Sequence, residues 1–365
     1  MLCKMRSEVV TPISANLLVA GVLAISSGHA VAADHNFIVE AFPDAVQASI
    51  EIHQKQIAAA AQGVTSLPNY LIVPTLNRWQ PASTVKVAFS GGDNDLRSRI
   101  ERTANEWTKP GVANIKFQFR QPNGSFLEWS EKDQHYSADI RVAFNSGDRG
   151  GYWSHVGRNS VNGDLVGGRP NEGSLNLDSF DKALPGDWQA VVIHEFGHAL
   201  GFQHEHQNPV GGCDFRFEDD AGYIPTKNAE GWYVVDVNGR RPGLYTYLGG
   251  YKNYWPRTKV DANLRAIPVS SAYLVGQFDK FSIMKYVFSA FMFVSGENSP
   301  CYTSSENLTL SDQDKDGARQ AYPSAPAAVA SAVSQKKTLL NEILASPQIS
   351  APFQANVRSQ LDLLK

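Results

Sequence analysis

The sequence has few cysteines, no excess of positive charge and no long apolar run beyond its N-terminal region. Three cysteines in 365 residues are too few for a small fold held together by disulfides. Lysine and arginine number 33 against 36 aspartates and glutamates, a formal net charge of -3, so nucleic acid is not expected as a partner. The remaining composition, 42% hydrophobic and 19% charged, is that of a globular protein long enough to bury a large core.

The N-terminus has the features of a secretory signal. Lys4 and Arg6 precede an apolar run at residues 17–25, and Ala-Val-Ala at 30–32 resembles a cleavage site, which predicts a signal peptide over residues 1–32. The run is far shorter than the ~20 residues of a membrane-spanning helix, so no transmembrane segment is expected. We therefore expect a secreted protein, extracellular or periplasmic.

Removal of this signal would leave two cysteines, Cys213 and Cys301. In an oxidising compartment the two can form a disulfide. Their spacing alone leaves a disulfide and two free thiols both open.

Hydrophobic periodicity predicts a mixed sheet backed by helices. Residues 33–76 are polar and alanine-rich with a helical pattern that ends near Gly63, as in a pro-like segment or a connector. Further along the chain, alternating apolar residues predict four strands, and helical spacing predicts two helices. The strands are expected near 84–90, 113–120, 137–145 and 174–180, and the helices near 96–107 and 188–200. This order indicates an α+β fold.

The segment HEFGHALGFQHEHQNP, residues 194–209, concentrates four histidines in sixteen positions. His194 and His198 are four residues apart, so a helix places both on one face, where they can bind one Zn²⁺ at about 2.0–2.1 Å. His204 reaches the same ion only if the helix ends first, and Gly201 can adopt the left-handed conformation of such an ending. Three histidines leave the fourth zinc position open, as in catalytic sites.

Glu195 follows the first histidine and is placed to act as general base. A carboxylate there can take a proton from a water whose pKa the zinc lowers toward ~7. The pattern H-E-x-x-H alone arises by chance in some chains, but the added glycine and third histidine make such a match far rarer. A helix with scattered histidines and no metal is the competing interpretation. Met284, in the short apolar segment FDKFSIMKY, is expected to pack beneath the histidines.

Several segments in the same order resemble the astacin-like metzincin zinc metalloprotease family. They are NRWQP, GGYWSHVGR, HEFGHALGFQHEHQNP, SIMKY and LTLSDQDKDGARQAYP. The resemblance implies a catalytic domain over residues 77–323, in subdomains of about 77–203 and 204–323. It also implies the metzincin-type fold, in which a backing helix and an active-site helix accompany a mixed twisted sheet. The less regular C-terminal subdomain would contain the methionine turn.

The resemblance also implies residue roles, and it keeps the zinc ligands and the base assigned above. Tyr286 would be the tyrosine that can coordinate zinc and then swing to stabilise the oxyanion. Met284 would support the site, and Glu205 would meet the new N-terminus left after removal of a pro-segment. The chain departs from the family pattern at Tyr152, Lys285 and Asn208-Pro209. The first stands in place of a disulfide cysteine. None of these departures alters the zinc chemistry.

Substrates of such proteases lie extended along a sheet edge and pair with it by main-chain hydrogen bonds. We expect SLNLDSF at residues 174–180, with Leu175 and Leu177, to form this edge, and residues 153–157, beginning with Trp153, to border the cleft. The aromatic-rich segment 231–256 is expected to pack inside the C-terminal subdomain rather than to bind substrate. DQDKDG at 312–317 lacks the last glutamate of an EF-hand, so Ser311 is expected to cap a helix instead.

Residues 324–365 are expected to form a linker and two short amphipathic helices that dock on the catalytic domain or bind a partner. The sequence as a whole predicts a secreted zinc endopeptidase that hydrolyses extended polypeptides. Two alternatives stay open. One is a secreted zinc-containing binding or adhesion protein without turnover, and the other is a zinc hydrolase acting on a non-peptide bond. The sequence sets neither the cleavage specificity nor the oligomeric state.

Overall fold

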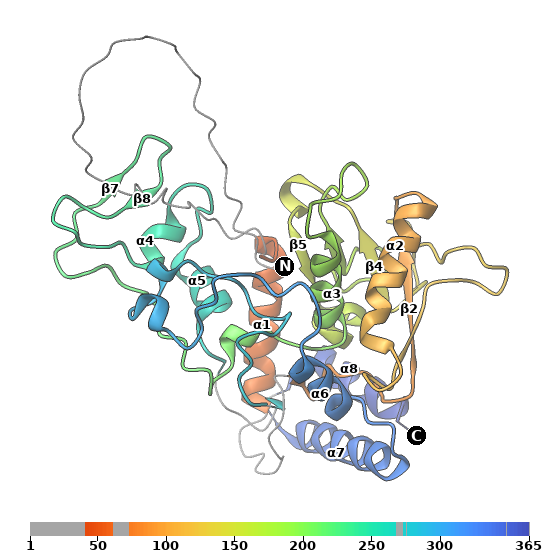
Figure 1. Ribbon diagram of the computed structural model, residues 1–365. Helices are drawn as coiled ribbons and strands as arrows, with labels where there is room; N and C mark the ends of the chain where they lie inside the picture. Colours follow the sequence, from red (N-terminus) through yellow and green to blue (C-terminus); the bar gives the residue numbers. More distant parts are fainter. Residues whose placement is uncertain (1–40, 61–72, 268–272, 275, 348, 365) are drawn as a thin grey trace.

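The computed structural model describes residues 41–60, 73–267, 273–274, 276–347 and 349–364, so the predicted signal peptide lies outside the described residues. The described helices are α1 (Asp44–Ala60), α2 (Asn94–Ala104), α3 (Trp188–Ala199), α4 (Leu244–Gly249), α5 (Arg257–Leu264), α6 (Asp312–Ala321), α7 (Pro326–Ala345) and α8 (Ala351–Asp362). Short 3-10 helices are η1 (Asn105–Thr108), η2 (Gly147–Arg149), η3 (Gly157–Val161), η4 (Glu205–Gln207), η5 (Ala290–Met292) and η6 (Gly296–Asn298). Helix α1 runs between a part that contains α2 and α3 and a part that contains α4 and α5 (Figure 1).

A five-stranded mixed sheet forms the centre of the first part. Its strands are β2 (Thr84–Phe89), β3 (Lys116–Gln118), β4 (Ile140–Ala143), β5 (Tyr152–Ser154) and β6 (Leu175–Leu177), in the spatial order β3-β2-β4-β6-β5. Strand β5 is antiparallel to β6, whereas the other pairings are parallel. Two small antiparallel sheets join β1 (Val73–Pro74) to β9 (Tyr273–Leu274) and β7 (Thr226–Lys227) to β8 (Tyr233–Val234).

This strand order shows that the prediction of the sheet edge was wrong. SLNLDSF contains β6, which lies between β4 and β5, while the edge is β5. Leu175 is paired with Val142 on one side and with Ser154 on the other, and both Leu175 and Leu177 are fully buried. β5 precedes β6 in the sequence, but β6 lies further inside the sheet, between β4 and β5. Neither leucine therefore borders a cleft, whereas Trp153 lies on the edge strand.

Helices α2 and α3 pack against each other, and both predicted helices are confirmed. Asp93 caps α2 by accepting a hydrogen bond from the Leu96 amide at 2.8 Å. Helix α3 is buried on nearly all sides, as its apolar sequence indicates. Trp107 lies in η1, directly after α2, and is fully buried. It donates its indole N–H to the carbonyl of Ile193 at 2.7 Å. This bond fixes the motif-bearing helix against the backing helix.

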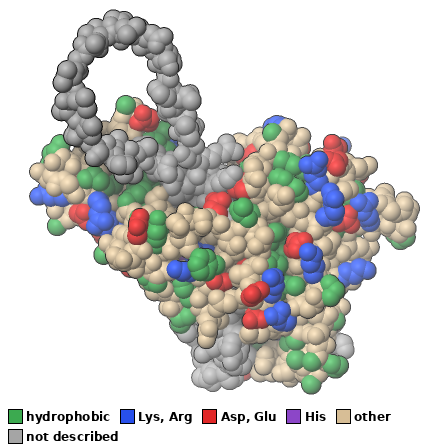
Figure 2. Space-filling view, viewed as in Figure 1, with side chains coloured by type: hydrophobic (Ala, Val, Ile, Leu, Met, Phe, Trp, Pro, Cys, Tyr) green, Lys and Arg blue, Asp and Glu red, His purple; other side chains and the backbone are tan. Residues whose placement is uncertain are grey.

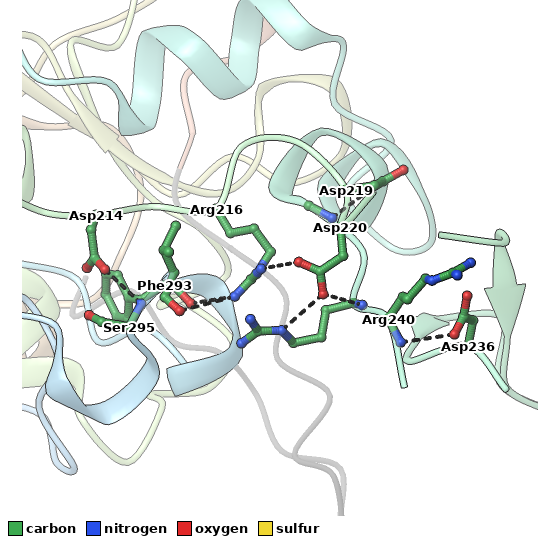
Figure 3. Close-up of polar contacts among 11 residues, drawn as sticks. Asp214, Arg216, Asp219, Asp220, Asp236, Arg240, Phe293 and Ser295 are labelled. Carbon is green, nitrogen blue, oxygen red and sulfur yellow. Dashed lines mark hydrogen bonds and ion pairs between the residues drawn. The ribbon is translucent and has the colours of Figure 1, made fainter. Parts of the chain in front are cut away.

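A disulfide and a charge network hold the second part together. Cys213 and Cys301 are bonded, with their Cα atoms 5.2 Å apart, so the alternative of two free thiols is excluded. Figure 3 shows Arg216 between the carboxylate of Asp220 and the backbone of Phe293. The guanidinium donates to the Phe293 carbonyl at 3.1 Å. These contacts join the segment after the third motif histidine to the segment after the methionine turn.

Aromatic side chains fill the interior of this second part, as predicted. Trp232, Tyr247 and Trp255 are buried, and the rings of Trp232 and Tyr247 stack with centroids 5.7 Å apart. Tyr245 and Tyr251 pack against the same core. Rings that are buried in this way contribute to packing and are not available as a substrate platform.

The predicted helix start at Ser311 is confirmed. Ser311 caps α6 by accepting from the Asp314 amide at 2.8 Å, while the Asp314 carboxylate accepts from the Ser311 amide at 2.9 Å. DQDKDG therefore lies in a helix and not in a calcium-binding loop. Helix α1 begins at Asp44, within the helical pattern of the pro-like segment.

The C-terminal region differs from its prediction, because most of the expected linker SAPAAVASAVS lies in α7. Alanine is the residue that favours helix most, and the single proline stands in the first turn, where a helix tolerates it. Helices α7 and α8 pack together in a cluster that contains Phe353 and also Leu76. The Lys336 ammonium donates to the Arg78 carbonyl at 2.6 Å. The hairpin thus docks on the rest of the chain, as one of the two alternatives predicted.

The surface carries charges of both signs. On the face shown in Figure 2, lysine and arginine are interspersed with aspartate and glutamate. The helices that the structure describes include none that is long and apolar enough to cross a membrane.

Candidate metal centre

The motif helix ends where the sequence predicts. Gly201 has φ +105°, a left-handed conformation that strains residues with a side chain. Its amide donates to the His198 carbonyl at 2.7 Å, and the Phe202 amide donates to the Gly197 carbonyl at 3.0 Å. These two bonds form a Schellman ending, which satisfies the last carbonyls of α3. The chain then turns back and brings His204 to the helix.

The three predicted histidines come together. The Nε2 atom of His198 lies 3.1 Å from Nε2 of His194 and 3.0 Å from Nε2 of His204, and all three side chains are buried. Nitrogens at zinc–imidazole distance from one tetrahedral ion would be separated by about 3.3–3.4 Å. The spacing therefore fits a single metal ion. These histidines are the group of potential metal ligands found among the described residues.

Two of the imidazoles are oriented by backbone carbonyls. Nδ1 of His194 donates to the Ile283 carbonyl at 2.7 Å, and Nδ1 of His198 donates to the Phe202 carbonyl at 2.7 Å. A proton held on Nδ1 leaves the Nε2 lone pair available for a metal. The donor set is therefore ready to bind zinc as neutral imidazoles.

Met284 packs against the motif helix, and this contact depends on a glycine. A Cβ atom on Gly197 would clash with the Met284 sulfur and would lie 2.9 Å from a ring carbon of Trp107. No role was predicted for Gly197 from the sequence, although a glycine inside an otherwise buried helix indicates a close neighbour. Glu195, on the same helix, is fully buried.

Tyr286 lies beside the histidines. Its ring is fully buried, with its centroid 4.4 Å from that of His204 and 6.2 Å from that of His194. Lys285, which departs from the family pattern, is buried and donates to the Tyr286 carbonyl at 2.8 Å. This lysine thus fixes the backbone of the methionine turn.

Glu205 belongs to a buried carboxylate group under the turn. It accepts hydrogen bonds from Asn208 at 2.8 Å and from the Asp279 amide at 3.0 Å. Burial raises the pKa of Glu205 to about 8 and that of Asp314 to about 6. Asn208, another departure from the family pattern, is therefore a direct partner of Glu205.

A cavity of about 130 Å³ opens onto the histidines, and its walls come from several elements. Trp153 contributes from the edge strand, Asn263 from α5, and Tyr286 from the methionine turn, while His198 and His204 line the same space. A neighbouring cavity of about 520 Å³ shares Trp153 and is lined also by Asp148 and Lys259. The two cavities together form a groove that runs past the edge strand β5 at Trp153.

The segment from residue 41 to α1 lies in this groove. Phe42 packs with its ring centroid 6.0 Å from that of Trp153 and 5.9 Å from that of His155. Asp44 pairs with Lys259 on α5 at 2.8 Å. Figure 1 shows α1 between α5 and the sheet. The sequence did not reveal this position, because helical periodicity does not indicate which surface a helix will cover.

Two buried histidines outside the metal site lie at the contact with this segment. His53 on α1 lies 3.3 Å from the Asn162 amide group, and its pKa is lowered mainly by burial, against the opposing effect of Asp164. Burial lowers the pKa of His155 to about 4. Both are therefore neutral at neutral pH.

No protein-family model matches the chain. Metalloendoproteinase 1 of Glycine max is 25% identical over 154 residues, which are 38% of this chain and 45% of that protein, so the chain spans less than half of this relative's length. The solved structure of myroilysin has 28% identity and a TM-score of 0.51, and the match covers 69% of this chain and 98% of myroilysin. High choriolytic enzyme 1, a hatching enzyme zinc-protease from Oryzias latipes, has 18% identity and a TM-score of 0.35, with 67% and 92% of the two chains covered. The chain has an α+β fold similar to that of the metzincin zinc proteases, with a mixed five-stranded sheet and a histidine triad able to bind a metal.

Proposed function

We propose that this chain, which has a metzincin-like fold and histidine triad, is a secreted zinc-dependent endopeptidase. One observation carries the proposal. Three buried imidazoles face one point at zinc-binding spacing, Glu195 lies on the helix that carries two of them, and the edge strand β5 contributes Trp153 to the same cavity. His194, His198 and His204 would hold the zinc.

The reaction would divide among a few side chains. When bound, zinc acts as a Lewis acid that polarises the scissile carbonyl and lowers the pKa of water. Glu195 takes the proton of the attacking water and delivers it to the leaving amine. The Tyr286 hydroxyl donates to the carbonyl oxygen as negative charge develops there. Met284 and Gly201 shape the site without taking part in the chemistry.

The substrate would be a polypeptide in extended conformation. Strand β5 is the last strand of the five-stranded sheet that the structure describes, so an extended polypeptide could add beside it as a further strand. Trp153 stands on this strand and lines both cavities of the groove. This geometry supports β5, in place of β6, as the strand that binds substrate.

Residues 33–76 would act as a removable pro-segment. Helix α1 and Phe42 line the cavity beside the triad, in space that a polypeptide substrate would need. The full chain would therefore be latent until this segment is removed. The catalytic domain would span residues 77–323, followed by the docked C-terminal region 324–365.

Secretion rests on the predicted signal at residues 1–32 and gains support from the Cys213–Cys301 bond. Disulfides persist in oxidising compartments and are rare in the reducing cytosol.

Cleavage of an unfolded protein by the purified chain tests the proposed function. The chain would be assayed before and after removal of α1, with chelator, with zinc restored, and beside an ester substrate. Zinc-dependent peptide fragments that increase after removal of α1 are expected. Bound zinc without any hydrolysis would instead support the binding protein, and hydrolysis of the ester alone would support the other hydrolase.

A further inference from the structure

The motif contains a fourth histidine, His206, that is outside the metal-binding triad. It lies on η4, two residues after His204, and its side chain is buried. Its ring centroid is 4.3 Å from that of Tyr286 and 5.0 Å from that of His204. His206 is thus in direct contact with the tyrosine and is also next to a ligand of the triad.

Four rings lie around Tyr286, those of His194, His204, His206 and Phe288, and they differ in how they are held. His204 would be committed to the metal, and Phe288, at 5.6 Å, makes only apolar contacts with the tyrosine. His206 is tied to another element, because its Nε2 atom donates to the Asn263 carbonyl of α5 at 2.8 Å. The plane of this ring is therefore fixed by a directional bond as well as by packing.

Gln207 of η4 makes further hydrogen bonds to the C-terminal end of α5. Gln207 donates to the carbonyls of Ala262 and Arg265 at 2.9 Å and 3.0 Å. The Ile267 amide donates back to the Gln207 carbonyl at 2.8 Å. Helix α5 and η4 consequently form one rigid base for the His206 ring.

We propose that His206 is the positioning residue for Tyr286, holding its ring so that the hydroxyl faces the cavity beside the triad. This inference rests on the proposed function, in which the Tyr286 hydroxyl stabilises the developing oxyanion. The Tyr286 hydroxyl can stabilise that charge only when its ring is oriented so that the O–H group reaches the developing oxyanion. A phenylalanine could fill the same volume, but it could not bond to Asn263. The histidine is therefore needed for orientation and not only for packing.

A double-mutant cycle between His206→Phe and Tyr286→Phe tests the proposal in the zinc-loaded protein after removal of α1. Each single change is expected to lower kcat by about 10²-fold, the effect of losing one oxyanion donor, with KM and zinc content little changed. In the Tyr286→Phe background, His206→Phe should have almost no further effect. Equal losses in both backgrounds would overturn the proposal, as would loss of zinc in the His206→Phe variant.

Binding of a phosphinic peptide, which mimics the tetrahedral oxyanion, gives a readout besides activity. Each single variant should bind the phosphinic peptide more weakly by a similar factor, and the double variant should bind it no more weakly than either single variant. A loss of affinity in the double variant equal to the product of the two single losses would contradict the proposal. Phe288→Leu is the packing control and should lower the melting temperature with a kcat change of about twofold or less. His206→Gln keeps a hydrogen-bond donor and should retain more activity than His206→Phe. If the phenylalanine variant does not fold, His206→Gln takes its place in the double-mutant cycle. A wild-type protein that cleaves substrate but gives an additive cycle would refute the role of His206 alone, while absence of cleavage would refute the proposed function.

Discussion

Gly197→Ala is expected to disturb the metal centre without removing any ligand. Gly197 lies on the buried helix α3, one residue before His198. An added Cβ would clash with the Met284 sulfur, lie 3.1 Å from the Met284 methyl carbon and lie 2.9 Å from Trp107. The methionine side chain is itself buried, and the cavity that it lines together with Trp107 has a volume of only about 20 Å³.

Two effects of opposite sign determine how much Gly197→Ala changes the free energy of unfolding. Alanine in place of glycine favours a helix by about 1 kcal/mol, whereas overpacking a core costs about 1–3 kcal/mol. The net change in unfolding free energy should be a loss of up to about 2 kcal/mol. Movement of Met284 also shifts the neighbouring Ile283 carbonyl, which accepts the His194 Nδ1 bond. Loss of such an orienting partner lowers metal affinity by about 10–100-fold.

Zinc affinity by chelator competition and thermal unfolding of the metal-free protein measure the two effects. Gly186→Ala is the matched control, because a Cβ there meets no atom within 4 Å, and it should match the wild type in both assays. Combining Gly197→Ala with Met284→Ala should cost less than the sum of the single changes, since the clash is removed. A Gly197→Ala protein that binds zinc and unfolds as the wild type does would refute the reasoning.

The remaining predictions concern the attachment of α1. Because burial lowers the pKa of His53 in the docked state, this histidine supports docking above its ordinary pKa of about 6.5, and that support is lost as the pH falls below it. Hydrogen exchange should therefore show α1 opening as the pH falls from 7.5 toward 5, despite the opposing charge of Asp164. His53→Asn should make the opening less dependent on pH, whereas equal opening of the wild type at every pH would contradict this effect. Lys259→Glu should loosen α1 through repulsion from Asp44 and speed its proteolytic removal, and adding Asp44→Lys should restore the wild-type rate. If the charge-reversed pair is released as fast as the single variant, the ion pair has no part in docking.

The metal centre could be predicted from the sequence because its geometry is mostly local. A helix fixes the spacing of His194 and His198, and Gly201 provides the turn that brings in His204. Close contacts at Gly197 could also have been predicted from the sequence, because a glycine in a buried helix indicates a close neighbour.

Features that depend on distant segments could not be predicted in this way. The three residues of β5 follow a glycine-rich turn, and their place at the sheet edge depends on pairing with a strand that comes later in the chain. The alanine-rich segment before Lys336 suggested a linker, but packing against α8 and Leu76 stabilises it as a helix. The position of α1 over the groove and the role of His206 likewise depend on tertiary contacts.

The most direct test of Glu195 as the general base compares the turnover of a single peptide by the wild-type protein and by Glu195→Gln. Both proteins are assayed at equal measured zinc content and after removal of α1. Glutamine keeps the size of the side chain but cannot accept the proton. Both proteins are expected to bind one zinc, and the variant is expected to cleave about 10²–10⁴-fold more slowly. A Glu195→Gln protein that retains zinc and cleaves at the wild-type rate would contradict the role of Glu195 as general base.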